Sequence, residues 1–146
     1  MDAKAGSRTR LAIVACALVT LLVATACIGP NQTEVLNALN QDRQAHGLRA
    51  LPIQNEAQAK AQAWAEKLAR ENRLYHSNLR DGFGPGWCSL GENVGLGPSV
   101  DSIERAYMNS PGHRANILAS KWTHVGVGHA KRGNTVFTVQ VFYKQC

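Results

Sequence analysis

The pattern of apolar and polar positions divides the chain into an uncharged leader and a series of short periodic segments. Residues 11–26 carry no charge and consist mainly of Ala, Val, Leu, Ile and Thr, and they follow the basic residues Lys4, Arg8 and Arg10. A run of about 16 residues is shorter than the ~20 that span a bilayer. Residues 1–26 are therefore typical of a secretion signal, with an uncleaved anchor helix as the alternative.

Helical periodicity dominates the first part of the remaining chain. Thr33 is a good N-cap for a helix that begins at Glu34, and Gly47 is a suitable stop for it. A longer helix begins after Asn55, because apolar residues then recur on one helical face as far as Leu68. The sequence predicts helices over 34–46, 56–73 and 100–108, and one or two further turns over 113–118.

Strand signals come last along the chain. Residues 123–130 and 135–143 are predicted strands, and residues 131–134 form the hairpin turn between them. The second strand is almost continuously apolar, so both of its faces should be covered. Helices followed by strands indicate an α+β fold, a three-layer α-β-α sandwich with a central antiparallel sheet. Residues 81–86 are predicted as a Gly/Pro turn, and 90–95 as a short motif between glycines.

Small residues precede Cys27 at the end of the leader, in the order Val23-Ala24-Thr25-Ala26. This run resembles a bacterial lipobox, in which the cysteine becomes the acylated N-terminus. The alternative is ordinary cleavage nearby, with Cys27 left as a free thiol. The predicted organisation is a lipoprotein-type signal peptide over 1–26, a short linker over 27–32 and one domain over 33–146.

Two further cysteines, Cys88 and Cys146, remain in the domain, and an even number in an exported chain favours a disulfide. The bridge would close a loop of about 58 residues and would contribute on the order of 3–4 kcal/mol. Without the leader, which contributes three of the 16 basic residues and one of the 10 acidic ones, the net charge is about +4. No dense basic stretch or aromatic platform indicates nucleic-acid binding.

Five short stretches in a fixed order carry a resemblance to a known family: Tyr75-His76-Ser77, Gly91-Glu92-Asn93-Val94, Tyr107 to Leu118 (YMNSPGHRANIL), Val125-Gly126-Val127-Gly128 and Val139-Gln140-Val141-Phe142. Together they resemble the CAP superfamily, also called SCP-like, which includes cysteine-rich secretory proteins, antigen 5 and pathogenesis-related proteins. The SPGHRANIL run is typical of its small bacterial branch. The resemblance covers about residues 33–143.

The resemblance implies an α-β-α sandwich with a cleft that two histidines and two glutamates line in many members. His76 matches the first histidine, Glu92 the glutamate of the Gly-Glu-Asn motif, and His113 the second histidine. The other glutamate has no match, because Ser110 occupies its place. Glu104, one turn before Tyr107, is the other candidate for the fourth cleft residue.

Some family members bind a divalent metal through the histidines, so His76 and His113 are the candidate ligands here. Imidazole nitrogens suit Zn²⁺, and Glu92 could accept the second ring N–H of one histidine. Two protein ligands imply weak binding. For each of the three residues, the alternative is a structural role in its loop or helix end.

The leading hypothesis is a non-enzymatic, envelope-attached domain that binds a lipid, a peptide or a cell-wall fragment in the cleft, with membrane attachment through the lipid on Cys27. A metal-dependent hydrolase, with Glu92 as base, is the second hypothesis. A thiol enzyme that uses Cys88 and His76 requires the disulfide to be absent. The third class is a surface scaffold or host-interaction protein with a vestigial cleft. The sequence assigns no catalytic residue and no oligomeric state.

Overall fold

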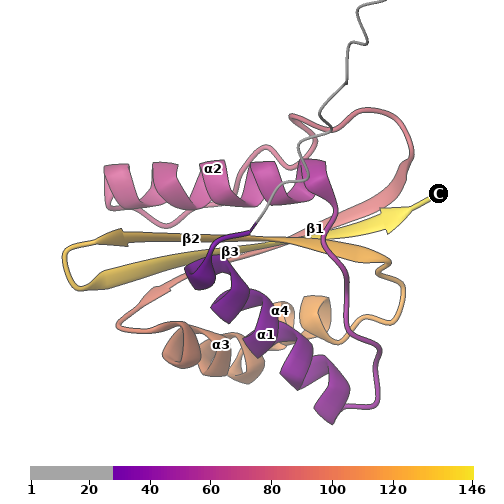
Figure 1. The fold of residues 1–146 in the computed structure, drawn as a ribbon, viewed down its shortest axis with the longest axis horizontal. Helices are drawn as coiled ribbons and strands as arrows, with labels where there is room; N and C mark the ends of the chain where they lie inside the picture. Colours follow the sequence, from indigo (N-terminus) through magenta and orange to yellow (C-terminus); the bar gives the residue numbers. More distant parts are fainter. Residues whose placement is uncertain (1–27) are drawn as a thin grey trace, which may run out of the picture.

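The computed structural model describes residues 28–146, and this part of the chain contains four helices and three strands (Figure 1). The predicted signal over 1–26 and the lipidation site Cys27 lie outside the described residues. No helix within 28–146 is long and apolar enough to cross a membrane. The elements are α1 (Pro30–Ala45), α2 (Asn55–Glu71), β1 (Trp87–Gly97), α3 (Val100–Asn109), α4 (Pro111–Ile117), β2 (His124–Arg132) and β3 (Thr135–Gln145).

The three strands form one antiparallel sheet in the order β1-β3-β2. Figure 1 shows α2 lying along one face of the sheet, with α1, α3 and α4 together on the other face. The predicted α+β sandwich, with helices on both faces of a central antiparallel sheet, is therefore confirmed.

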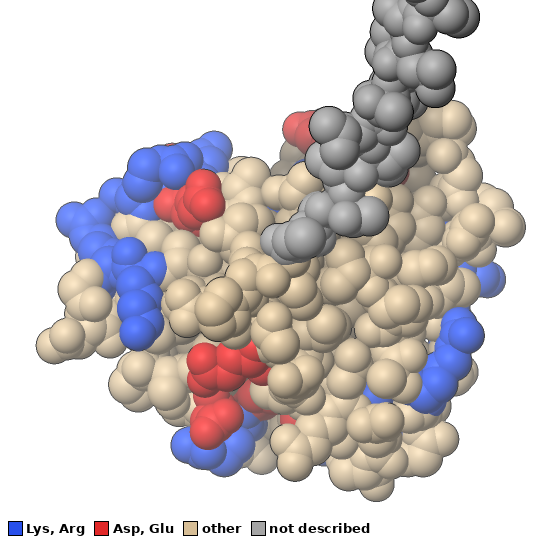
Figure 2. All heavy atoms as spheres, in the orientation of Figure 1, with Lys and Arg blue, Asp and Glu red and all other residues tan. Residues whose placement is uncertain are grey.

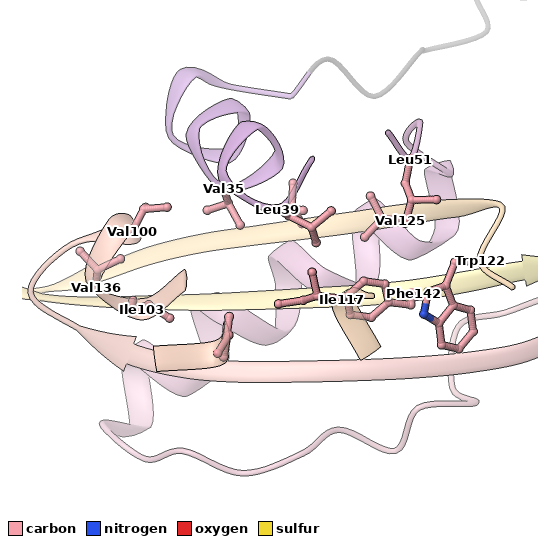
Figure 3. Close-up of a cluster of buried hydrophobic side chains, with 12 residues drawn as sticks. Val35, Leu39, Leu51, Val100, Ile103, Ile117, Trp122, Val125, Val136 and Phe142 are labelled. Atoms are coloured by element: carbon pink, nitrogen blue, oxygen red, sulfur yellow. The ribbon is translucent and has the colours of Figure 1, made fainter. Parts of the chain in front are cut away.

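The central strand β3 separates two hydrophobic cores. Phe137, Val139 and Val141 face α2, where they pack against a row of alanines and Leu68. Val136 and Phe142 face the other way and join side chains of α1, α3 and α4 (Figure 3). Because both faces of β3 are buried, the strand has the nearly continuous apolar sequence that predicted its position.

Helix α2 approaches strand β2 unusually closely. A Cβ atom built on Gly126 would lie 2.0 Å from the carbonyl carbon of Ala57, and one on Gly128 would lie 2.1 Å from the carbonyl oxygen of Ala61. Real side chains cannot adopt such separations. The alanines of α2 and the glycines of the Val-Gly-Val-Gly motif therefore serve one purpose, which is to bring the helix backbone onto the strand.

Two sequence predictions need correction. Helix α1 begins at Pro30, inside the predicted linker over 27–32, because proline suits the first helical turn and the Gln32 side chain accepts a bond of 2.6 Å from the Gly29 N–H. The second correction is β1, an 11-residue strand where the sequence predicts only a short motif over 90–95. Its glycines obscure the strand pattern, because glycine is uncommon inside strands. They are needed where α3 packs closely: a Cβ on Gly95 would lie 2.7 Å from Ile103 and Tyr107.

The predicted disulfide between Cys88 and Cys146 is present. It joins the start of β1 to the chain end just after β3, and the Cys146 N–H also donates to the Gly86 carbonyl at 2.9 Å. The C-terminus is therefore held against the loop that precedes β1.

Positive charge gathers at one end of the molecule, beside the β2–β3 turn and the C-terminal end of α2 (Figure 2). Part of it has a structural role, because Arg132 donates hydrogen bonds to the carbonyls of Ala69 and Arg70 at 3.4 and 2.7 Å. These are terminal carbonyls of α2, where a cation is favourable.

Candidate functional site

The predicted site residues meet at the outer edge of β1. A cleft of about 250 Å³ opens there, between the loop that follows α2 and the start of α4. Its lining residues come from three separate stretches of the chain: His76, Glu92, Asn93, Ser110, Gly112, His113 and Asn116. The sequence motifs thus become one site only in the folded chain.

Glu92 holds His76 in place on the loop side of the cleft. Its Oε1 lies 2.8 Å from Nδ1 of His76 and also accepts a bond of 2.9 Å from the Ser77 N–H. The Glu92 side chain is 3% exposed, whereas that of His76 is 62% exposed. The carboxylate therefore orients an accessible ring whose Nε2 makes no hydrogen bond to any residue of 28–146. The second carboxylate oxygen, Oε2, is buried without a partner in the same range.

His113 occupies the opposite wall, in the first turn of α4. Its Nδ1 lies 2.9 Å from Oγ of Ser110, and its ring packs against Tyr107 with centroids 5.0 Å apart. Burial lowers the pKa of His113 below its ordinary value, and the neighbouring His76 lowers it further. The ring is therefore neutral at pH 7, as a metal or hydrogen-bond ligand requires.

The structure also identifies the fourth cleft residue. Ser110 lines the cleft and bonds His113. Glu104, on the buried face of α3, is only 5% exposed, and its Oε2 lies 2.7 Å from Nε2 of Gln140. The position that is acidic in many family members is thus filled by a neutral hydroxyl. Glu104 is not a cleft residue.

A buried amide network supports the cleft floor. Asn93 donates to Gln140 Oε1 at 3.0 Å and to the His113 carbonyl at 3.2 Å, and Asn116 donates to Asn93 Oδ1 at 3.0 Å. Two features of the sequence indicate this network: the Asn that follows Glu92 in the motif, and Gln140, a large polar residue in a mainly apolar strand. Fully paired buried amides of this kind fix the relative position of strand and helix.

The hydrogen bonds of the cleft do not form a Ser-His-acid relay. Ser110 contacts a histidine, but the carboxylate of the cleft bonds the other histidine, so no nucleophile, base and orienting acid follow one another. Among residues 28–146, no group of three or more His, Cys, Asp or Glu side chains is arranged to hold a metal. A metal in this cleft would have two imidazole ligands and water, which is an open, weak site.

A second and larger cavity, of about 730 Å³, lies outside the cleft between α2 and the loop over 74–82. Its lining includes Ala59, Ala63 and Trp64. Trp64 is half-buried and donates to the Tyr75 carbonyl at 3.0 Å. None of the predicted site residues borders this cavity.

A family model described as the cysteine-rich secretory protein family, CAP, matches residues 36–143. The chain belongs to the CAP family. The uncharacterized protein YkwD of Bacillus subtilis is 29% identical over 134 residues, which are 86% of this chain and 52% of that protein. This CAP chain thus spans about half the length of that curated relative.

Solved structures show the same fold at low sequence identity. An outer surface protein of Borrelia burgdorferi superposes with a TM-score of 0.67 at 19% identity, covering 80% of this chain and 93% of the other. An extracellular SCP-domain protein of Bacillus anthracis gives 0.66 at 22% identity, covering 83% and 45%. Venom allergen-like protein 4 of Schistosoma mansoni gives 0.65 at 15%, covering 82% and 91%.

Proposed function

We propose that this chain is an exported CAP domain, attached to the cell envelope through Cys27, that binds a ligand non-enzymatically in the His76/His113 cleft. The basic and apolar leader and the small residues before Cys27 support export and anchoring. The extracellular and outer-surface proteins among its structural relatives are consistent with that location. The lipid, peptide and wall-fragment classes named from the sequence are the candidate ligands.

One observation carries the proposal: the two cleft histidines are both fixed through Nδ1, by Glu92 and by Ser110. Nε2 is then the nitrogen that each ring has left for a ligand. Orientation of an imidazole by a carboxylate is the usual support of a metal-binding histidine. We infer that His76 and His113 hold a divalent ion, best matched by Zn²⁺, which would supply a positive charge for an anionic or carbonyl group of the ligand.

Calorimetric titration with ZnSO₄ at pH 7 tests the metal component. The protein used is residues 28–146, which contain every described helix and strand and both hydrophobic cores. Wild type should bind one ion, and the His76→Ala/His113→Ala variant should bind none. Glu92→Gln should weaken binding less, because its proposed role is to orient His76. His46→Ala, which removes an exposed histidine outside the cleft, is the matched control.

Lower pH should weaken binding, because a protonated imidazole cannot coordinate and histidine titrates near 6.5. Affinity measured at pH 5.5 should therefore fall below that at pH 7. Equal zinc uptake by wild type and the double variant, or no uptake by either, would show that the histidines do not bind metal.

The hydrolase and the scaffold remain distinct alternatives. A hydrolase requires turnover that a chelator abolishes, and a vestigial cleft requires the double histidine variant to retain full cellular function. Glu92 bonds His76 and Ser77, whereas His113 bonds Ser110, and this pairing favours the binding role over a hydrolase that uses Ser110.

A further inference from the structure

The two edges of the sheet are treated differently. In β2, alternate residues turn their backbone groups away from β3. The outward residues are Val125, Val127, His129 and Lys131, as the register and the bonds of the first three to other segments show. Exposed backbone groups of this kind would pair with any extended chain.

From Val125 to His129, every outward backbone group of β2 is hydrogen-bonded to another part of the chain. Gln58 donates to the Val127 carbonyl at 2.8 Å and accepts from the Val127 N–H at 2.9 Å. Gln62 makes the same pair of bonds with His129, both of 3.0 Å. The Val125 N–H donates to the Pro52 carbonyl at 2.9 Å, and the Val125 carbonyl accepts from Gln54 at 3.0 Å. Two side-chain amides of α2 and the backbone bonds to Pro52 and Gln54 therefore close the β2 edge from Val125 to His129.

The β1 edge has no such cover. Val127 lies opposite Gln140 of β3, and the backbone groups of Val127 point away from β3. In such a pair the backbone groups of both residues point outward, so Gln140 and the other even-numbered residues of β3 point theirs toward β1. The register then turns Leu90, Glu92, Val94 and Leu96 of β1 outward. A bond of 3.3 Å from Asn116 to the Glu92 carbonyl confirms this direction, and it is the one hydrogen bond from residues 28–146 that reaches these outward groups.

This open edge runs through the cleft. Glu92 belongs both to the outward set and to the cleft lining, with His76 on one side and His113 on the other. At Glu92 the edge is recessed, because this residue is only 7% exposed and lies in the cleft with His76 of the loop and His113 of α4. A recessed edge is accessible to a single extended chain, whereas a strand that belongs to another folded domain would bring its neighbouring elements with it. Leu96, the last outward residue of β1, is 47% exposed, so this end of the edge is open to solvent.

We propose that the ligand of the cleft is an extended peptide that adds to β1 as a fourth strand. Its backbone pairs with the outward N–H and C=O groups of Leu90, Glu92 and Val94, and its side chains reach the two histidines. This inference rests on the proposed ligand-binding function and selects the peptide from its candidate ligands. Backbone pairing supplies affinity that is largely independent of sequence, and the cleft supplies selectivity.

Nuclear magnetic resonance of ¹⁵N-labelled residues 28–146 in EDTA tests the proposal without metal, so its outcome is separate from the zinc titration. The probe is Ac-Lys-Val-Thr-Val-Thr-Val-Lys-NH₂, titrated to about 1 mM, which detects even weak binding. Amide shifts should centre on Leu90, Glu92 and Val94, and the amides of Val127 and His129 should not move. The same peptide N-methylated at every internal residue should bind at least tenfold more weakly, because it lacks the N–H groups that pair with the strand.

A positive control comes from the closed edge. Gln58→Ala/Gln62→Ala removes the side chains that occupy Val127 and His129, and the peptide should then shift those amides too. If that variant does not fold, the comparison of the two peptides on wild type still decides. The proposal is overturned by unmoved β1 amides, by equal binding of the methylated peptide, or by β1 shifts that depend on protein concentration alone, which would indicate pairing with a second copy.

Discussion

Glu104 of α3 accepts a hydrogen bond of 2.7 Å from Gln140 of β3, and this contact connects a buried carboxyl to the amide network beneath the cleft. The other oxygen, Oε1, is buried without a hydrogen-bond partner in residues 28–146. Burial, with a smaller contribution from the nearby Asp42, raises the pKa of Glu104 to about 8, although the hydrogen bond from Gln140 lowers it. The folded protein therefore keeps this side chain protonated at neutral pH.

This protonation predicts a stability that falls with rising pH. Between pH 4.5, the ordinary value, and about pH 8, the folded state binds a proton that the unfolded state has released. The stability from the proton is complete below about 4.5 and is lost as pH rises through 8. Urea unfolding at pH 5, 7 and 9 measures the free energy of unfolding of both proteins. Relative to wild type, the value for Glu104→Gln should rise with pH, by a few kcal/mol at pH 9. Asp101→Asn, an exposed change on the same helix, should follow wild type; a pH-independent difference for Glu104→Gln would contradict the prediction.

The glycines of β2 should tolerate no side chain. Gly126→Ala or Gly128→Ala places a Cβ within about 2 Å of the α2 backbone, so the helix must move off the sheet. We expect a loss of at least about 3 kcal/mol in the free energy of unfolding, or failure to fold. Gly112→Ala is the control, because a Cβ there meets nothing within 4 Å. Denaturant unfolding monitored by circular dichroism measures all three, and near-wild-type stability of either β2 variant would refute the close packing.

The disulfide should stabilise the domain without being required for its fold. Neither hydrophobic core includes Cys88 or Cys146, which are 58 residues apart in the sequence. Cys88→Ser/Cys146→Ser should therefore lose about 3–4 kcal/mol and still unfold cooperatively. Peptide mapping without reductant should recover the linked pair from wild type. Free thiols at both positions in oxidised, folded protein would exclude the bridge.

Acylation of Cys27 should decide membrane association. With the lipid attached, the domain should sediment with membranes after cell fractionation. The Cys27→Ser variant cannot be acylated at this position and should lose this membrane association. Mass spectrometry of the wild-type N-terminal peptide should show the acyl modification. Equal partitioning, together with an unmodified Cys27 peptide, would contradict the anchor.

Local sequence determined much of this fold. Helix α2, helix α3 and the β2–β3 hairpin were predicted within a few residues, because periodicity and turn residues act between near neighbours. The pairing of Cys88 with Cys146 also followed from the sequence, since these were the two cysteines that remained in the domain. The resemblance to the CAP family selected His76, Glu92 and His113, and the fold brings all three to one cleft.

Only the tertiary structure decided the remaining features. The glycines of β1 obscure the strand pattern in the sequence. They are needed because distant side chains, Trp122 and Ile103 and Tyr107 of α3, leave no room for a Cβ atom at these positions. That Ser110 and not Glu104 lines the cleft depends on how α3 lies on the sheet. Glu104 faces the core from within α3, whereas Ser110 lies between α3 and α4 and contacts His113. The closed β2 edge and the open β1 edge likewise depend on strand order and on the reach of Gln58 and Gln62. Local patterns specify which segments become strands and helices, whereas contacts between distant segments set what each face and edge meets.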